Sequence, residues 1–257
     1  MSLPNRGPVR AMHSTQNTTQ RSLPVGKAQS PILTRELLVA RGASTLVRMD
    51  EPGIRLLTEA ERRASLDAFM ANRPAGPLWV FAYGSLVWNP ALRISERRLA
   101  YVRGWHRSFC LSMPVGRGTP KAPGLALGLD RGGVCHGVAY RIAERDIATE
   151  LPILWSREML LGGYDPTWVD VIATDNLRFG SAIAFTSDPD HDHYASDLPR
   201  PEKVKRLATA AGSWGSSRDY LLRTVDSLRQ LGIRDREMEH LGDLVMPAAP
   251  QTLRQAA

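Results

Sequence analysis

The sequence predicts an α+β fold, and the order of its patterns is the main reason. Two helical patterns come first, short β-rich runs with one embedded helical pattern follow, and three helical patterns close the chain. Strands and helices that are segregated along a chain are typical of α+β proteins. No segment repeats at a fixed period, which argues against solenoids and propellers. An apolar share of 43% among 257 residues is enough for a real core.

Residues 1–34 are rich in Ser, Thr, Asn, Gln, Pro and Arg and contain few large apolar side chains. Because burial of so little apolar surface would not offset the entropy lost on ordering, we expect a disordered basic tail. An Arg-rich start without acidic residues also resembles an organellar transit peptide. Pro4, Pro8 and Pro24 would interrupt the amphipathic helix of such a peptide, so we favour the tail.

A helical N-terminal extension is expected over residues 35–77. Its second helix should begin after Thr58, because a Thr followed three residues later by Glu61 is the pattern of a capping box. The segment 74–77 contains two prolines and a glycine and should end the extension as a turn or linker.

The remaining elements form one domain, expected over residues 78–245, with a C-terminal tail over residues 246–257. The expected strands are residues 78–83, 99–102, 108–113, 125–129, 133–141, 168–174 and 181–186. The expected helices are residues 144–160, 200–211, 217–231 and 235–245. Pro152 lies inside the first of these helices, where it indicates a kink or a later start.

The net charge of +7 does not by itself indicate a nucleic-acid-binding protein, because the location of the charge matters more than its sum. Residues 1–35 hold five basic residues and no acidic one, which leaves +2 for residues 36–257. A surface that follows phosphates needs a concentrated basic patch on the folded part. We therefore expect no nucleic-acid partner.

The longest apolar runs, such as residues 78–83, are far shorter than the roughly 20 residues that cross a bilayer, so we expect no membrane partner. Cys110 and Cys135 are the two cysteines, too few for a disulfide framework. Both lie in strand-like runs, where cysteine is usually a small buried side chain. We expect a reducing compartment and place the protein in the cytoplasm.

The motif Phe81–Pro90 carries an apolar strand directly into Gly84 and Ser85 and ends at Asn-Pro. Gly84 permits a sharp turn and a close approach of the backbone. Successive N–H groups at such a strand exit can bind a carboxylate, with the Ser85 hydroxyl as a further donor. An ordinary turn at the end of a strand would have the same pattern, and this segment alone leaves both interpretations open.

A second motif, Trp155–Pro166, places Glu158 between apolar neighbours near a helix end and follows it with a Gly-Gly pair. A carboxylate in such surroundings is partly desolvated, which raises its pKa and makes it a stronger base. The alternative is a surface glutamate that forms an ion pair with Arg157 or Arg145.

Two other segments are weaker candidates. His191 and His193 lie in an acidic polar loop that lacks a third well-spaced ligand of the zinc type, so we expect no metal. The segment Gly116–Thr119 is basic and flexible enough to hold an anion, but it lacks the Gly-Lys-Ser/Thr end of a phosphate loop. We interpret it as a hairpin loop.

Together the two main motifs resemble the paired signatures of the ChaC family within the γ-glutamyl cyclotransferase superfamily. The matching residues are Tyr83-Gly84-Ser85-Leu86-Val87-Trp88 for a substrate loop, and Arg157-Glu158 with Gly162-Gly163-Tyr164 for an acid/base segment. Supporting pieces in the family's order are Val102–Phe109, Gly137–Arg141 and Asp219–Leu221. The resemblance covers about residues 78–245 and leaves the first 77 residues unexplained.

The resemblance implies a small mixed β-barrel, closed or nearly so, with flanking helices. It implies that residues 83–88 bind a γ-glutamyl group, that Glu158 is the catalytic acid/base, and that no cofactor takes part. Tyr164 and Tyr220 are secondary substrate-binding candidates.

The implied reaction is cleavage of glutathione to 5-oxoproline and cysteinylglycine by the substrate's own α-amine. The alternatives are a cyclotransferase for other γ-glutamyl amides and a non-enzymatic regulator of cation transport. The oligomeric state does not follow from the sequence.

Overall fold

The computed structural model describes residues 33–50 and 53–246. Its helices are α1 (Arg35–Asp50), α2 (Glu59–Met70), α3 (Ser85–Trp88), α4 (Ile147–Glu158), α5 (Arg200–Thr209), α6 (Ser217–Gln230) and α7 (Arg236–Val245). Its strands are β1 (Leu78–Ala82), β2 (Glu96–Met113), β3 (Gly124–Ile142), β4 (Tyr164–Ile172), β5 (Arg178–Ser187), β6 (Ala211–Gly212) and β7 (Gly215–Ser216). The predicted tails lie outside the described residues, except for Leu33, Thr34 and Met246.

Five strands close into a mixed barrel in the order β1-β3-β2-β4-β5. Most neighbours are antiparallel, and the barrel is completed by a parallel pairing of β1 with β5 at Trp79↔Ala182 and Val80↔Ile183. All five residues of β1 are buried, as expected of a strand with packed neighbours on both faces. The predicted α+β class and the mixed barrel are confirmed.

The four strands predicted between residues 99 and 141 are in fact two long ones, and this part of the prediction was wrong. β2 and β3 pair continuously from Glu96↔Arg141 to Met113↔Gly124. A register shift between Arg103 and Trp105 accommodates Gly104, whose φ is +81°. A bulge of this kind bends and twists a strand without ending it.

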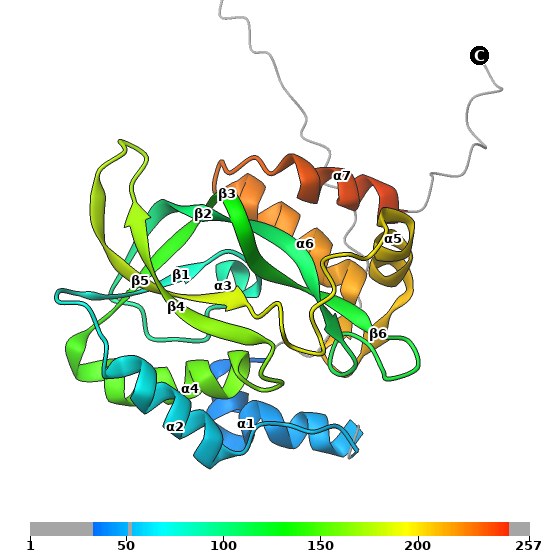
Figure 1. The fold of residues 1–257 in the computed structure, drawn as a ribbon, viewed down its shortest axis with the longest axis horizontal. Coiled ribbons are helices and arrows are strands. Elements are labelled where there is room, and N and C mark those ends of the chain that lie inside the picture. The colour runs from blue at the N-terminus through cyan, green and yellow to red at the C-terminus, as the bar shows by residue number, and fades with distance from the viewer. Residues whose placement is uncertain (1–32, 51–52, 247–257) are drawn as a thin grey trace, which may run out of the picture.

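The helices cover the barrel in two groups (Figure 1). α1, α2 and α4 lie on one side, and α5, α6 and α7 lie on the other. The barrel interior and α6 and α7 share one apolar cluster, which includes Phe109, Leu127 and Leu221. A second cluster joins the outer face of β1 to α2 and α4 through residues such as Val80 and Trp155.

The helices agree closely with the patterns that predicted them. Thr58 forms the predicted capping box, because its side chain accepts from the Glu61 N–H at 3.1 Å and the Glu61 carboxylate accepts from the Thr58 N–H at 2.7 Å. Pro152 neither ends nor delays α4, which begins at Ile147 after a 3₁₀ turn. Burial of Leu151 and Leu154 offsets the backbone hydrogen bond that the proline removes.

Within the described ranges, no helix combines the length and the apolar character needed to cross a membrane.

Candidate active site

The first motif passes from β1 through Tyr83 and Gly84 into α3, a single helical turn that the sequence analysis did not predict. A Cβ atom added at Gly84 would lie 3.0 Å from the Tyr220 hydroxyl and 3.5 Å from the Leu127 Cβ. The close approach of α6 and β3 therefore explains why glycine occupies this position. It also brings the start of α3 directly against Tyr220.

The N–H groups at the start of α3 differ in their availability. The Val87 N–H donates to the Gly84 carbonyl at 3.0 Å, so it is already used inside the turn. Those of Ser85 and Leu86 open the helix, where no preceding helical carbonyl can accept from them. They are the groups of this loop best placed to bind a carboxylate.

Glu158 is the last residue of α4, and its side chain is 11% exposed. Its Oε1 lies 2.9 Å from the Arg157 Nε but is buried without a hydrogen-bond partner among the described residues. Burial raises the pKa of the Glu158 carboxyl, and the positive charge of Arg157 opposes this rise in pKa. Glu158 does form the ion pair with Arg157 that the alternative interpretation expected. The pair is not on the surface, however, because both side chains are largely buried.

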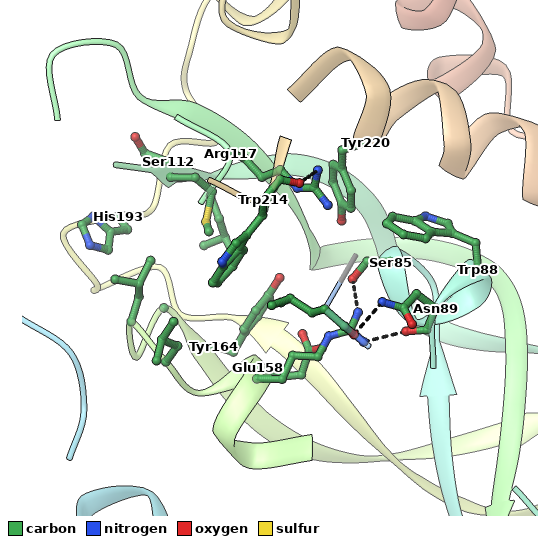
Figure 2. Close-up of a pocket in the computed structure, with 18 residues that line it drawn as sticks. Ser85, Trp88, Asn89, Ser112, Arg117, Glu158, Tyr164, His193, Trp214 and Tyr220 are labelled. Carbon is green, nitrogen blue, oxygen red and sulfur yellow. Dashed lines mark hydrogen bonds and ion pairs between the residues drawn. The ribbon is translucent and has the colours of Figure 1, made fainter. Parts of the chain in front are cut away.

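Arg157 connects the two motifs and was missed as a functional residue. Its side chain is 6% exposed, its Nη2 donates to Ser85 Oγ at 2.8 Å and its Nη1 donates to the Asn89 carbonyl at 2.6 Å. Figure 2 shows these contacts beside Glu158. Arg157 thus holds both ends of α3 next to Glu158, the candidate base.

Three tyrosines surround the same carboxylate: Tyr83 and Tyr220 are buried, and Tyr164 is half-buried. The Tyr83 hydroxyl donates to the Phe185 carbonyl, and the Tyr164 hydroxyl donates to the Leu127 carbonyl at 2.7 Å. Burial is the main cause that raises the pKa of all three phenols, to about 12 for Tyr220. They remain protonated at neutral pH and present hydroxyl groups rather than anions.

Two adjoining cavities meet at Glu158. Both are open to solvent on one side; the larger has about 860 Å³ of empty space and the smaller about 250 Å³, open solvent included. Both are lined by Ser85, Glu158, Tyr164 and Tyr220. We call the smaller one the inner pocket and the larger one the outer cleft.

The residues of the candidate substrate loop, 83–88, line different cavities. Tyr83, Gly84 and Leu86 line only the inner pocket, and Trp88 lines only the outer cleft. Val87 lines neither, because its side chain packs against the second apolar cluster.

Arg117 and Trp214 also line the outer cleft, although the sequence analysis assigned neither a role. Arg117 lies in the predicted hairpin loop, its guanidinium 5.2 Å from the centre of the Tyr220 ring, and it donates to the Trp214 carbonyl. Burial lowers its pKa to about 10, so it remains a cation at neutral pH. The position of Arg117 between two glycines was a sequence signal for an anion-binding residue, whereas no sequence pattern indicated a role for Trp214.

His193 lines the outer cleft, and its ring centre lies 5.1 Å from that of His191. Over residues 33–50 and 53–246, no group of three His, Cys, Asp or Glu side chains is arranged to hold a metal ion. Cys110 and Cys135 are both buried as free thiols, and burial raises the pKa of the Cys110 thiol to about 11. A neutral thiol is a poor nucleophile.

Comparisons with known proteins show which family the chain belongs to. Residues 78–248 match the family model described as ChaC-like protein. A protein of Escherichia coli (strain K12) named glutathione-specific gamma-glutamylcyclotransferase is 40% identical over 216 residues, which are 84% of this chain and 91% of that protein. The mouse glutathione-specific gamma-glutamylcyclotransferase 1 is 33% identical over 178 residues, which are 67% of this chain and 80% of the relative.

Among solved structures, a γ-glutamyl cyclotransferase from yeast, described as specific to glutathione, superposes with a TM-score of 0.61 at 22% identity. The match covers 66% of this chain and 96% of the yeast protein, and it supports the fold. The match of residues 78–248 to the family model, together with the 40% identity to the E. coli protein, shows that the chain belongs to the ChaC-like protein family.

Proposed function

We propose that this protein is a glutathione-specific γ-glutamylcyclotransferase that converts glutathione to 5-oxoproline and cysteinylglycine. The observation that carries the proposal is the carboxylate of Glu158 at the junction of the inner pocket and the outer cleft, with an Oε1 that is buried and is paired with Arg157 but accepts no hydrogen bond among the described residues. The names of the E. coli and mouse relatives support glutathione as the substrate.

The reaction needs no nucleophile from the protein. In a γ-glutamyl amide, the free α-amine attacks the γ-carbonyl, a five-membered lactam forms, and the amide bond to the downstream amine breaks. One proton leaves the attacking nitrogen and one is gained by the departing nitrogen, so the atoms balance without water. Holding the curled conformer accounts for up to roughly 7–11 kcal/mol of the barrier in favourable cases.

Glu158 is the group that moves the proton. Its carboxylate removes a proton from the α-ammonium or from the attacking amine and returns it to the leaving nitrogen. A raised pKa suits both halves of this cycle, because it makes the carboxylate a stronger base and keeps the acid form accessible near neutral pH.

The inner pocket and the outer cleft each bind one half of the substrate. The inner pocket takes the γ-glutamyl group, where the N–H groups of Ser85 and Leu86 meet the α-carboxylate and the phenols of Tyr164 and Tyr220 orient it. The outer cleft takes the cysteinylglycine half. All three guanidinium nitrogens of Arg157 already contact Asn89, Ser85 and Glu158, whereas Arg117 donates through Nη1 to the Trp214 carbonyl. We therefore assign Arg117 to the carboxylate of the cysteinylglycine half.

The direct test is an assay of the purified protein with glutathione, in which both products are followed by liquid chromatography and mass spectrometry. Equal amounts of 5-oxoproline and cysteinylglycine are expected. γ-Glutamylalanine, tested in parallel, should be a poorer substrate because it lacks the thiol and the glycine. Absence of 5-oxoproline from glutathione would overturn the proposed function, and faster turnover of γ-glutamylalanine would correct the substrate.

We expect N-acetyl-glutathione to give no products, because acetylation removes the attacking amine while the γ-amide stays intact. A hydrolase that tolerates the acetyl group would still cleave it. Since poor binding would also stop the reaction, a second measurement uses glutathione in ¹⁸O-water. The 5-oxoproline released should carry no solvent oxygen, whereas ¹⁸O-labelled glutamate as the first product would contradict the cyclisation mechanism.

A further inference from the structure

Leu33 is a wall residue of the outer cleft, although it lies 52 residues before Ser85 in the chain. It directly precedes α1, its side chain is 9% exposed, and it lines the outer cleft but not the inner pocket. Leu33 together with α1, here called the N-terminal arm, lies outside the residues that the family model matches.

A buried ion pair fixes this arm to α4. Arg35 donates through both terminal nitrogens to Glu150, with Nη2 at 2.8 Å from Oε1, and the Glu150 side chain is fully buried. The Glu150 Oε2 also accepts from the Arg93 N–H at 3.0 Å. Moving Arg35 away would leave the buried Glu150 carboxylate without its cation, which strongly destabilises a fold. The ion pair therefore holds the arm in one position.

The arm also contacts Asn89, the residue that directly follows the substrate loop. The Asn89 Nδ2 donates to the Leu33 carbonyl at 3.0 Å, while the Asn89 carbonyl accepts from Arg157. One residue therefore links the arm to the guanidinium beside Glu158. Apolar packing adds to the contact, because Leu33 shares a buried cluster with Val115 and with Leu160, and Leu160 also lines the cleft.

We propose that the N-terminal arm completes the subsite for the leaving dipeptide, with Leu33 as a specificity-determining residue that contacts the cysteinylglycine half of the substrate. The inference rests on the proposed function, because it uses the division of the substrate between inner pocket and outer cleft. Leu33 gives an apolar surface to the cysteine side chain, and the bond from Asn89 gives Leu33 a fixed position.

Inhibition by each product of the reaction measures binding in one half of the site. Cysteinylglycine should inhibit by binding in the outer cleft, and 5-oxoproline should inhibit by binding in the inner pocket. For Leu33→Ala we expect the inhibition constant of cysteinylglycine and the KM for glutathione to rise about tenfold. The inhibition constant of 5-oxoproline and kcat should change less than twofold.

A second variant tests the arm without leaving a buried charge. Arg35→Met combined with Glu150→Gln removes both partners of the ion pair, and we expect the same selective loss of cysteinylglycine binding. Arg63→Ala is the matched control, because Arg63 is an exposed arginine of α2 that pairs with Asp67, and neither residue lines the cleft. If Leu33→Ala does not fold, Leu33→Val replaces it, with a smaller shift of the same kind.

The two proposals fail in different ways. An inactive wild-type protein would overturn the proposed function itself. An active wild type whose Leu33 and Arg35/Glu150 variants bind both products as before, or lose both equally, would overturn the role of the arm.

Discussion

Replacement of Glu158 by glutamine is expected to lower kcat for glutathione by about 10²- to 10⁴-fold, the usual contribution of a general base. Glutamine keeps the size of the side chain but cannot accept and return a proton. The KM should change little, because the substitution leaves intact the N–H groups of Ser85 and Leu86, to which we assign the α-carboxylate. Steady-state rates of 5-oxoproline formation measure the effect.

The matched control is Glu144→Gln, which changes an exposed glutamate just before α4. It should leave kcat within about twofold, since a surface substitution of this kind removes only an exposed ion pair with Arg73. Near-normal turnover by folded Glu158→Gln protein would remove Glu158 from the mechanism.

Glu158→Gln should also change the stability of the fold in a pH-dependent way. Because burial raises the pKa of Glu158 in the folded protein, the folded state holds this proton more tightly than the unfolded chain does. The stability that the neutral carboxyl contributes is therefore present at acid pH and is lost as pH rises through the raised pKa. We expect Glu158→Gln to melt at a higher temperature than wild type near pH 8, with the difference disappearing near pH 4.

Replacement of Arg157 by methionine is expected to lower kcat/KM by about 10²-fold, because displaced reacting groups cost rates of this order. The variant loses the bonds to Ser85 and Asn89 that hold both ends of α3. It also removes the positive charge that opposes the raised pKa of Glu158. The acidic limb of the pH profile of kcat/KM should therefore move to higher pH.

The shift of this limb distinguishes positioning from simple damage to the fold, which would lower the rate at every pH alike. Arg145→Met, at an exposed arginine just before α4, should leave both rate and profile unchanged. A folded Arg157→Met protein with the wild-type profile would show that this guanidinium does not act on Glu158.

Local patterns predicted the parts of the site that depend on local structure. The apolar run before Gly84 predicted β1 and the turn that follows it, and the apolar neighbours of Glu158 predicted its desolvation. Breaks in the hydrophobic pattern of β2 and β3 were misinterpreted as strand ends, because register shifts and pairing between long strands are not local properties.

The residues that sequence reasoning missed reach the site through contacts distant in the chain. Arg117 donates to a carbonyl 97 residues away, at Trp214, and Asn89 donates to one 56 residues away, at Leu33. Neither Trp214 nor Leu33 has a neighbouring pattern that indicates a binding surface. Their positions follow only from the way the residue before α1, the turn between β6 and β7, and the loop after β2 meet around the cleft.

The parallel pairing of β1 with β5 has a consequence for how the protein folds. β1 lies between strands that come much later in the chain, since its partners are Val138–Ile142 of β3 and Ala182 and Ile183 of β5. Such long-range pairings require large loops to close, which is slow compared with helix formation. Because the loop from Tyr83 to Trp88 continues directly from β1, it reaches its final place only when the last barrel strand arrives. On a growing chain, the inner pocket thus cannot exist before β5 has been made. Because Tyr220 of α6 also lines this pocket, it is complete only once α6 has packed against the closed barrel.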